Sequence, residues 1–199
     1  MWVVKLGGSL GRDPLLREWL QELSELGGGR IVVVPGGGGF AEQVREHRAQ
    51  WAFDHVVAHN MAVLAMAQYG LMMQGMCPGM SLAVHEKDIQ GVLRNAGVAV
   101  WAPFSLLREQ ADEMTHPGVG SDSMAAWLSN RLNAEMLLLV KSTPADAGQA
   151  VEQYAAQGLV DRRFAHFTHG APYPIEFLHK SELARMRELL LHPAAGCSY

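Results

Sequence analysis

Short apolar stretches alternate with longer stretches of helical periodicity along almost the whole chain. The apolar stretches are rich in β-branched residues and show little polar–apolar alternation, which is typical of strands buried on both faces of a parallel sheet. The predicted strands are residues 3–6, 31–34, 81–84, 98–101, 135–140 and 174–178. This alternation predicts an α/β fold with a mainly parallel sheet, in a single domain over residues 1–199.

The helical patterns lie between these stretches. We predict helices over residues 15–26, 40–50, 54–74, 86–95, 147–157 and 181–191, and a further helix that begins at Ser121–Asp122. Asp13 is expected to cap the first helix with Pro14 at its first position, and Gly27–Gly29 to end it. The predicted helix over residues 54–74 carries a stripe of mainly apolar residues that we expect in the core or at a subunit interface. The stripe consists of Met61, Leu64, Ala65, Gln68 and Met72.

Composition excludes several classes of protein. The net charge of −4 argues against a nucleic-acid-binding protein, and two cysteines are too few for a disulfide framework or a zinc site. No secretory signal is visible, and Gln68, Gly70 and Gln74 interrupt the most apolar stretch, so we expect no membrane span. With 49% hydrophobic and 18% charged residues, we expect a cytoplasmic protein that forms a homo-oligomer.

Two glycine-rich segments each follow a predicted strand. Gly7 and Gly8 follow the first strand, and Gly36–Gly39 follow the second. Without a Cβ atom, such residues leave backbone N–H groups open to an anion. The helix that begins near Phe40 adds the positive end of its dipole. The two segments therefore predict a site that handles phosphate groups, as in phosphoryl transfer.

Two lysines and one aspartate are candidates for the charges of such a site. Lys5 lies inside an apolar strand just before the glycine pair, and Lys141 lies at the carboxyl end of residues 135–140. Ligands of open α/β sheets bind at the carboxyl ends of strands. Asp122 either caps its helix or holds the two lysines over the transferring phosphate. Phosphoryl transfer needs mainly positioning and charge neutralisation, which these side chains would supply.

Other glycine-rich motifs fit less well. The Walker A pattern is absent, because Arg12 stands five residues after Gly7 where a glycine is required. The segment from Gly36 to Ala41 satisfies a relaxed dinucleotide fingerprint, but the acidic Asp54 opens a helix instead of ending a strand. A dinucleotide-binding domain remains the weaker alternative.

In this order and spacing, three motifs resemble those of the amino acid kinase superfamily. They are Lys5–Ser9, Pro35–Ala41 and Ser121–Ser123, and the resemblance extends from the first strand through Lys141. The superfamily includes acetylglutamate, aspartate, uridylate, carbamate and isopentenyl phosphate kinases. The resemblance implies a three-layer αβα sandwich with an open, mainly parallel central sheet, and ATP across its carboxyl edge.

The resemblance also implies roles for individual residues. Lys5, Asp122 and Lys141 would be catalytic, with Asp122 organising the lysines. ATP would be bound by Gly7, Gly8, Ser9, Lys141, Ser142 and Thr143. The acceptor would be bound by Gly36, Gly37, Gly38, Arg45 and His59. Mg²⁺ would be held mainly through the nucleotide phosphates, with no metal ligand from the protein.

Residues 53–68 look most like one branch of the superfamily, the kinase of methanofuran-type cofactor biosynthesis, which phosphorylates an aminomethyl-furan methyl phosphate. The molybdenum storage proteins are similar as well. Gly196–Ser198 looks like the closing strand of the family. After Lys141, however, the chain lacks the Asp-Gly-Val-Tyr-like segment that helps to house adenine. The nucleotide pocket is therefore expected to be trimmed or rebuilt.

Histidines leave several alternatives open. His55 and His59 are four residues apart on one predicted helix face, where they could bind a metal or an anionic acceptor. No third ligand stands at an obvious spacing, so we favour an acceptor contact by His59. His166 and His169 are expected at the surface or at an interface, and Arg45 either faces the acceptor or solvent.

These observations predict an ATP-dependent kinase that phosphorylates a small anionic metabolite, and we expect the acceptor to be a phosphate monoester. A phosphate oxygen is already a nucleophile at neutral pH, so no general base is needed. The alternative is a non-catalytic nucleotide- or oxyanion-binding oligomer of the same fold. The identity of the acceptor is not encoded in any recognisable motif.

Overall fold

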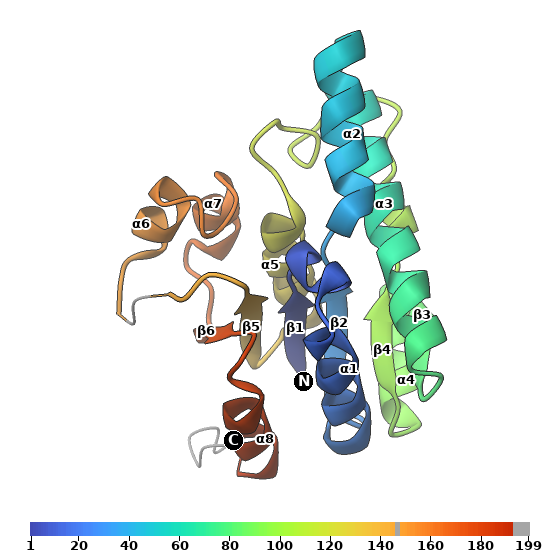
Figure 1. The fold of residues 1–199 in the computed structure, drawn as a ribbon, viewed down its shortest axis with the longest axis vertical. Helices are drawn as coiled ribbons and strands as arrows, with labels where there is room; N and C mark the ends of the chain where they lie inside the picture. The colour runs from blue at the N-terminus through green and yellow to red at the C-terminus, as the bar shows by residue number, and fades with distance from the viewer. Residues whose placement is uncertain (146–147, 193–199) are drawn as a thin grey trace.

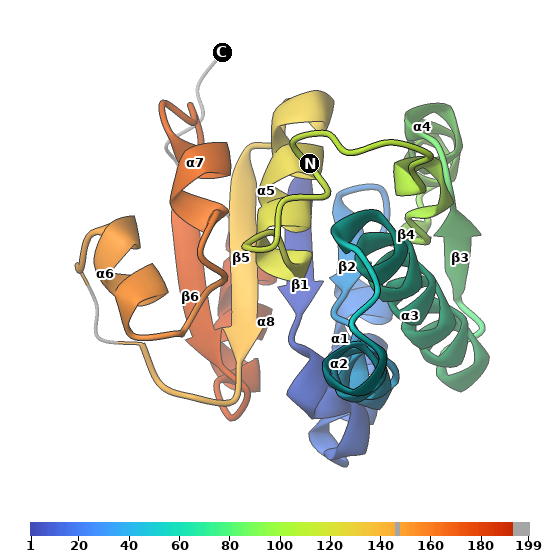
Figure 2. The ribbon, with the colours of Figure 1, turned by 90° about the horizontal axis from the view of Figure 1, so that it is seen from above.

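The computed structural model describes residues 1–145 and 148–192, and its centre is a six-stranded parallel sheet between two layers of helices (Figures 1 and 2). The strands follow the order β3-β4-β2-β1-β5-β6 across the sheet. They are β1 (Trp2–Leu6), β2 (Ile31–Pro35), β3 (Met80–Ala83), β4 (Val98–Trp101), β5 (Met136–Lys141) and β6 (Ile175–His179). The predicted αβα sandwich is confirmed.

Helices connect the strands and cover both faces of the sheet. They are α1 (Leu15–Leu26), α2 (Gly38–Trp51), α3 (His55–Met76), α4 (Glu86–Arg94), α5 (Ser121–Leu132), α6 (Val151–Ala156), α7 (Phe164–Thr168) and α8 (Leu183–Leu191), with 3₁₀ turns η1 (Gly8–Arg12) and η2 (Phe104–Leu106). Alternate strand residues face opposite layers. Val3 packs toward α4, α5, α6 and α7, and Val4 packs toward α1 and α8.

The entry to α1 differs by one position from the prediction. Asp13 Oδ1 accepts a hydrogen bond from Leu15 N at 3.0 Å, so Asp13 does satisfy an amide at the helix start. Pro14, however, precedes the helix instead of opening it. At the other end Gly27 terminates α1, and a Cβ on Gly28 would lie 2.4 Å from Ala96 O. The glycines therefore form a helix exit that packs closely against the turn before β4.

The buried face of α3 differs from the predicted stripe. Val63, Met66, Tyr69 and Met73 are buried, whereas Leu64 is 40% exposed. Because α3 is apolar on nearly all sides, periodicity alone could not select the face that packs on the sheet. Among the described helices, α3 alone is long and apolar enough to cross a bilayer, but half of its most apolar window is buried inside the fold. That burial is typical of a core helix.

α2 and the first half of α3 form a two-helix arm that extends beyond the carboxyl edge of the sheet (Figure 1). None of the fourteen residues of α2 is fully buried, and the helix packs mainly along α3. The arm starts at the glycine-rich segment after β2, so it projects directly from the predicted phosphate site.

The carboxyl-terminal third of the chain completes the sheet. The helix predicted over residues 147–157 corresponds to α6, which is shorter, while α7 has no counterpart in the prediction. The predicted closing strand at residues 196–198 lies outside the described residues. β6 pairs in parallel with β5 and places Lys141 opposite His179.

Candidate functional site

Two lysines and one aspartate meet at the carboxyl ends of the neighbouring strands β1 and β5. Lys5 lies on β1 and Lys141 at the end of β5, and the two strands pair in register, with Leu6 beside Val140. Lys5 Nζ is 2.7 Å from Asp122 Oδ1, and Lys141 Nζ is 2.7 Å from Asp122 Oδ2. Each carboxylate oxygen thus serves one ammonium group. We call Lys5, Asp122 and Lys141 the lysine cluster.

The lysine cluster is buried, and burial shapes its charges. Lys5 is 4% and Asp122 6% exposed. Burial works to raise the pKa of Asp122, but the two lysines outweigh it and hold the pKa below its ordinary value. Burial and then the charge of Lys5 lower the pKa of Lys141 to about 8, against the pull of Asp122. At neutral pH the cluster therefore carries two positive charges and one negative charge.

Asp161 supports the cluster from a distant part of the chain. Its Oδ2 accepts a hydrogen bond from Ser123 N at 2.9 Å, and its Oδ1 accepts one from Ser123 Oγ. Gly120 precedes α5 and has no side chain to cap it, and a Cβ there would lie 2.9 Å from Asp161 Oδ2. Asp161 thus caps the first turn of α5, the turn that carries Asp122.

Burial is also the main reason that the pKa of Asp161 is raised, followed by the negative charge of Asp122, although the bonds from Ser123 oppose the shift. Sequence reasoning gave Asp161 no role, because a single aspartate outside any motif carries no signal. The only clue is indirect. The helix that begins at Ser121 follows a glycine and needs a cap from elsewhere.

The two glycine-rich segments contact one another backbone to backbone. A Cβ on Gly8 would lie 2.5 Å from Gly38 N, and a Cβ on Gly36 would lie 2.6 Å from Gly8 N. Glycine is required there by this close approach. Gly7 N donates to Val140 O and Gly36 N donates to Leu6 O, so these two amides serve the fold.

Other amides of the same segments are free to meet a ligand. In the described part of the chain, the N–H groups of Gly8, Ser9, Gly37 and Gly38 have no hydrogen-bond acceptor. Gly37 directly precedes α2, so the free amides at this helix start also add the positive end of a dipole. The two glycine-rich segments thus offer an anion site whose hydrogen-bond donors are these four N–H groups.

Residues predicted to bind the nucleotide lie on the other side of the glycine pair. Ser9 Oγ and Ser142 Oγ are 2.6 Å apart, which ties the turn after β1 to the chain after β5. His179 Nε2 lies 3.0 Å from the Ser142 carbonyl oxygen. Thr143 is exposed next to Ser142. Ser9, Ser142 and Lys141 are therefore brought to one place.

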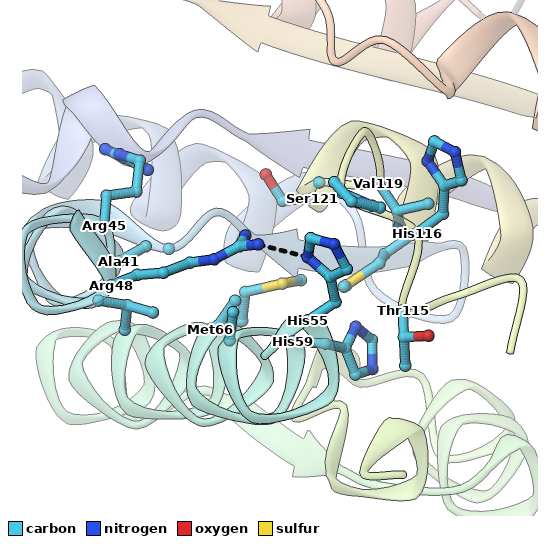
Figure 3. A pocket seen from close by; sticks show the side chains of 17 residues that line it. Ala41, Arg45, Arg48, His55, His59, Met66, Thr115, His116, Val119 and Ser121 are labelled. Atoms are coloured by element: carbon cyan, nitrogen blue, oxygen red, sulfur yellow. Dashed lines mark hydrogen bonds between the residues drawn. The ribbon is translucent and has the colours of Figure 1, made fainter. Parts of the chain in front are cut away.

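A cavity of about 260 Å³ lies between the arm and the segment from Thr115 to Ser121 (Figure 3). Gly37 and Ser121 line it near the lysine cluster, and Arg45 and His59 also contribute to its lining. Arg48 and His55 point toward one another across the cavity (Figure 3) and form a hydrogen bond. We call this cavity the arm pocket. Sequence reasoning did not identify Arg48 or His116 as part of it.

The residues predicted to bind the acceptor differ in whether their side chains already have partners in the protein. His59 is buried, and its Nε2 lies 2.7 Å from Leu106 O, so one ring nitrogen already has a partner. Burial is the main cause of the lowered pKa of His59, which favours its neutral form. Arg45 is exposed and has no ion pair in the described part of the chain. His166, in contrast, pairs with Glu113 away from this pocket.

No group of three or more histidine, cysteine or acidic side chains in the described residues could hold a metal ion. The carboxylates closest to the site already have ion-pair or hydrogen-bond partners. Both oxygens of Asp122 meet lysines and both oxygens of Asp161 meet Ser123.

Fold and site together define a class, the α/β proteins that bind phosphate groups at the carboxyl edge of a parallel sheet. Residues 1–145 match the model of the amino acid kinase family. The chain therefore belongs to the amino acid kinase family. This membership supports the predicted phosphotransferase class.

Solved structures share the fold at low identity. A uridylate kinase from Archaeoglobus fulgidus is 14% identical with a TM-score of 0.68, and the match covers 94% of this chain and 96% of that one. A UMP kinase from Bacillus anthracis is 15% identical with a TM-score of 0.66, over 96% and 91% of the two chains. An isopentenyl phosphate kinase is 13% identical with a TM-score of 0.61, over 96% of each chain. No curated protein matches the chain.

Proposed function

We propose that this protein is a kinase that transfers the γ-phosphoryl group of ATP to the phosphate group of a small molecule. One observation carries the proposal: the lysine cluster lies at the carboxyl ends of β1 and β5, next to the segment that begins at Gly7, with two ammonium groups fixed on one buried carboxylate. The names of two similar proteins, a uridylate kinase and an isopentenyl phosphate kinase, indicate phosphorylated small molecules as their acceptors, which is consistent with this proposal.

In the proposed reaction, the protein positions the two reactants and neutralises the moving charge. An oxygen of the acceptor phosphate attacks the γ-phosphorus, and the bond to the bridging oxygen of ADP breaks. Lys5 and Lys141 stabilise the negative charge on the transferring oxygens, and Asp122 keeps the two ammonium groups in place. The attacking oxygen is already ionised, so no side chain has to accept a proton.

The free amides support an assignment of the two sides of the site to the donor and the acceptor. The N–H groups of Gly8 and Ser9 would hold donor phosphates, and those of Gly37 and Gly38 would hold the acceptor phosphate. Mg²⁺ would bind through the nucleotide phosphates and supply further charge neutralisation there. The carboxylate oxygens of Asp122 and Asp161 already bind protein groups, which is consistent with that arrangement.

The finer acceptor proposed from sequence resemblance is an aminomethyl-furan methyl phosphate, as in methanofuran-type cofactor biosynthesis. It is a phosphate monoester, the kind of acceptor proposed above. It also carries an ammonium group, and this feature separates it from other phosphate monoesters of similar size.

A non-catalytic nucleotide- or oxyanion-binding protein is the second candidate. The chain after β5 favours it, because Ser142 is engaged with Ser9 and His179 and no Asp-Gly-Val-Tyr-like segment follows Lys141. Binding of ATP without release of ADP in the presence of any phosphorylated acceptor would support this alternative over the kinase.

The substitution Lys5→Ala tests the proposal. Removing one preorganised charge from a transferring phosphoryl group is expected to lower the single-turnover rate by about 10²–10³-fold. Lys87→Ala is the matched control, since Lys87 is an exposed lysine on α4. A rate for Lys5→Ala within a few-fold of the wild type would rule out the mechanism.

A further inference from the structure

The arm pocket carries positive charge that no side chain of the pocket balances. Arg45 and Arg48 line it beside three histidines, His55, His59 and His116, and no carboxylate of the described residues does. Nearby acids have other partners. Asp54 caps α3 by accepting a bond from Val57 N, and Glu42 pairs with Arg12. An arginine keeps its charge at any physiological pH.

The hydrogen bond between Arg48 and His55 orients the two side chains. A guanidinium group can only donate, so His55 Nδ1 accepts and Nε2 is left to donate. The pair therefore presents the charge of Arg48 and an N–H donor of His55. Both suit an anionic group such as a carboxylate or a phosphate.

This cationic pair lies far from the end of the pocket where phosphate would react. Gly37, Gly120 and Ser121 mark the reacting end, since Asp122 is the next residue in the chain. Along α3 the pocket extends from Met66 to His55, eleven residues, or about 16 Å at the rise of an α-helix. Ala58 and Ala62 lie between these ends and leave room for an elongated ligand.

The wall between the two ends offers hydrogen-bond donors but no free side-chain acceptor for a nucleobase. Thr115 is buried and its Oγ1 donates to Asp112 O, while His59 Nε2 meets Leu106 O. Arg45 and His116 also line this stretch, but a guanidinium group can only donate and His116 Nδ1 already accepts from Gly118 N. The remaining residues, such as Ala62, Met66 and Val119, are apolar. A base would have to bury its N–H donors without side-chain acceptors, which costs binding free energy.

We infer that the acceptor carries two anionic groups at opposite ends of a small apolar body, and that it is neither a nucleotide nor an amine. The reacting phosphate lies at Gly37 and Ser121, and the second anion binds Arg48 and His55. This inference rests on the proposed kinase function, because it uses the same pocket for the acceptor. It opposes an acceptor with an ammonium group, which would meet only positive charge at the far end.

Three aromatic phosphates that differ in one group test the inference: para-carboxybenzyl phosphate, benzyl phosphate and para-(aminomethyl)benzyl phosphate. With wild-type enzyme and ATP, kcat/KM for ADP release is expected to fall in that order. The carboxylate should exceed the amine by about tenfold to a hundredfold, as for a charge-assisted hydrogen bond. Uridine monophosphate should be a poorer acceptor than para-carboxybenzyl phosphate. Equal or higher kcat/KM for the amine or for uridine monophosphate would overturn the inference.

Two variants test whether the preference for the carboxyl compound arises in the arm pocket. Arg48→Gln should reduce the ratio of kcat/KM between the carboxyl compound and benzyl phosphate to near one. Arg17→Gln, on the exposed surface of α1, should leave the ratio unchanged. A ratio that survives Arg48→Gln would overturn the assignment of the second anion to this pair.

Binding without turnover separates this inference from the kinase proposal. Calorimetric titration of the three phosphates in the absence of ATP should show the same order and the same dependence on Arg48. If that order holds while no compound is phosphorylated, the kinase function fails and the pocket assignment stands. If ADP is released with the amine as the best acceptor, the kinase function stands and the pocket assignment fails.

Discussion

The lysine cluster and the arm pocket both concentrate positive charge, but they treat that charge in opposite ways. In the cluster, Asp122 lies 2.7 Å from each of two buried ammonium groups. In the arm pocket, Arg48 donates a hydrogen bond to the ring of His55, and no carboxylate of the described residues lines the cavity. One region contains its counter-charge, and the other leaves it to be supplied by a ligand.

This difference has consequences for stability and for binding. Removing a partner from the buried cluster leaves an uncompensated charge, so the cluster should be sensitive to substitution in the absence of any ligand. The partly exposed cations of the arm pocket cost the folded protein little, and their effect should appear only when an anion binds. The following experiments test this contrast, from the largest expected effect to the smallest.

Asp122→Asn should have the largest effect on stability. The two lysines would lose their shared counter-charge in a buried site, which typically costs about 3–5 kcal/mol of the free energy of unfolding. Urea denaturation measures it, and Glu86→Gln, which breaks the surface pair with Arg131, should cost less than about 1 kcal/mol. Equal losses for the two variants would contradict the contrast.

Gly8→Ala should disturb the boundary between the two regions. Its Cβ would lie 2.5 Å from Gly38 N, so the glycine-rich segments would have to separate, at a cost of about 1–3 kcal/mol in the free energy of unfolding. Gly91→Ala on α4 is the matched control, because nothing lies within 4 Å of its Cβ position. There alanine should stabilise the helix by about 0.5–1 kcal/mol. A neutral Gly8→Ala variant would argue against the contact.

Lys141 should make the pH dependence of activity differ from that of stability. Its pKa near 8 predicts that kcat/KM for ATP falls above pH 8, by about tenfold per pH unit, as the ammonium loses its proton. The folded-state pKa lies below the ordinary value of 10.5, so the unfolded chain binds this proton more tightly. The contribution of Lys141 to stability therefore rises between pH 8 and 10.5 while activity falls.

The substitution Lys141→Arg serves as the control for this pH profile. An arginine stays charged, so the fall of kcat/KM near pH 8 should disappear even if the rate is lower overall. A fall that persists unchanged in the arginine variant would assign the titration to another group.

Asp161→Asn should have the smallest effect. Because burial and Asp122 raise the pKa of Asp161, the native state binds its proton more tightly than the unfolded chain. The contribution of Asp161 to stability is thus largest near pH 4 and is lost as pH rises through the raised pKa. The difference in unfolding free energy between wild type and Asp161→Asn should shrink from pH 4 to 7. A growing difference would contradict the assignment.

Much of the fold follows from the sequence because the strands are apolar on both faces. β2 and β4 have uninterrupted apolar stretches and were predicted within one residue of their observed limits. The charges of the cluster were also visible, since Lys5 and Lys141 are isolated lysines at the ends of such strands. An isolated charge in an apolar strand has few structural explanations.

The remaining features depend on contacts between distant residues. The buried face of α3 could not be chosen because apolar residues surround the helix. Arg48 lies one turn beyond Arg45 on a polar helix surface, where sequence alone does not distinguish a pocket residue from a solvated one. Asp161 lies outside every motif, and its role follows from its proximity to Ser123, thirty-eight residues earlier.

The contact between Asp161 and Ser123 limits how the chain could be shortened. A fragment that ended after residue 145 would contain every motif of the family. It would nevertheless lack the cap of α5, and the loss of β6 would turn β5 into an exposed edge strand. The lysine cluster therefore depends on the segment that follows it in the chain, even though that segment carries no recognisable motif.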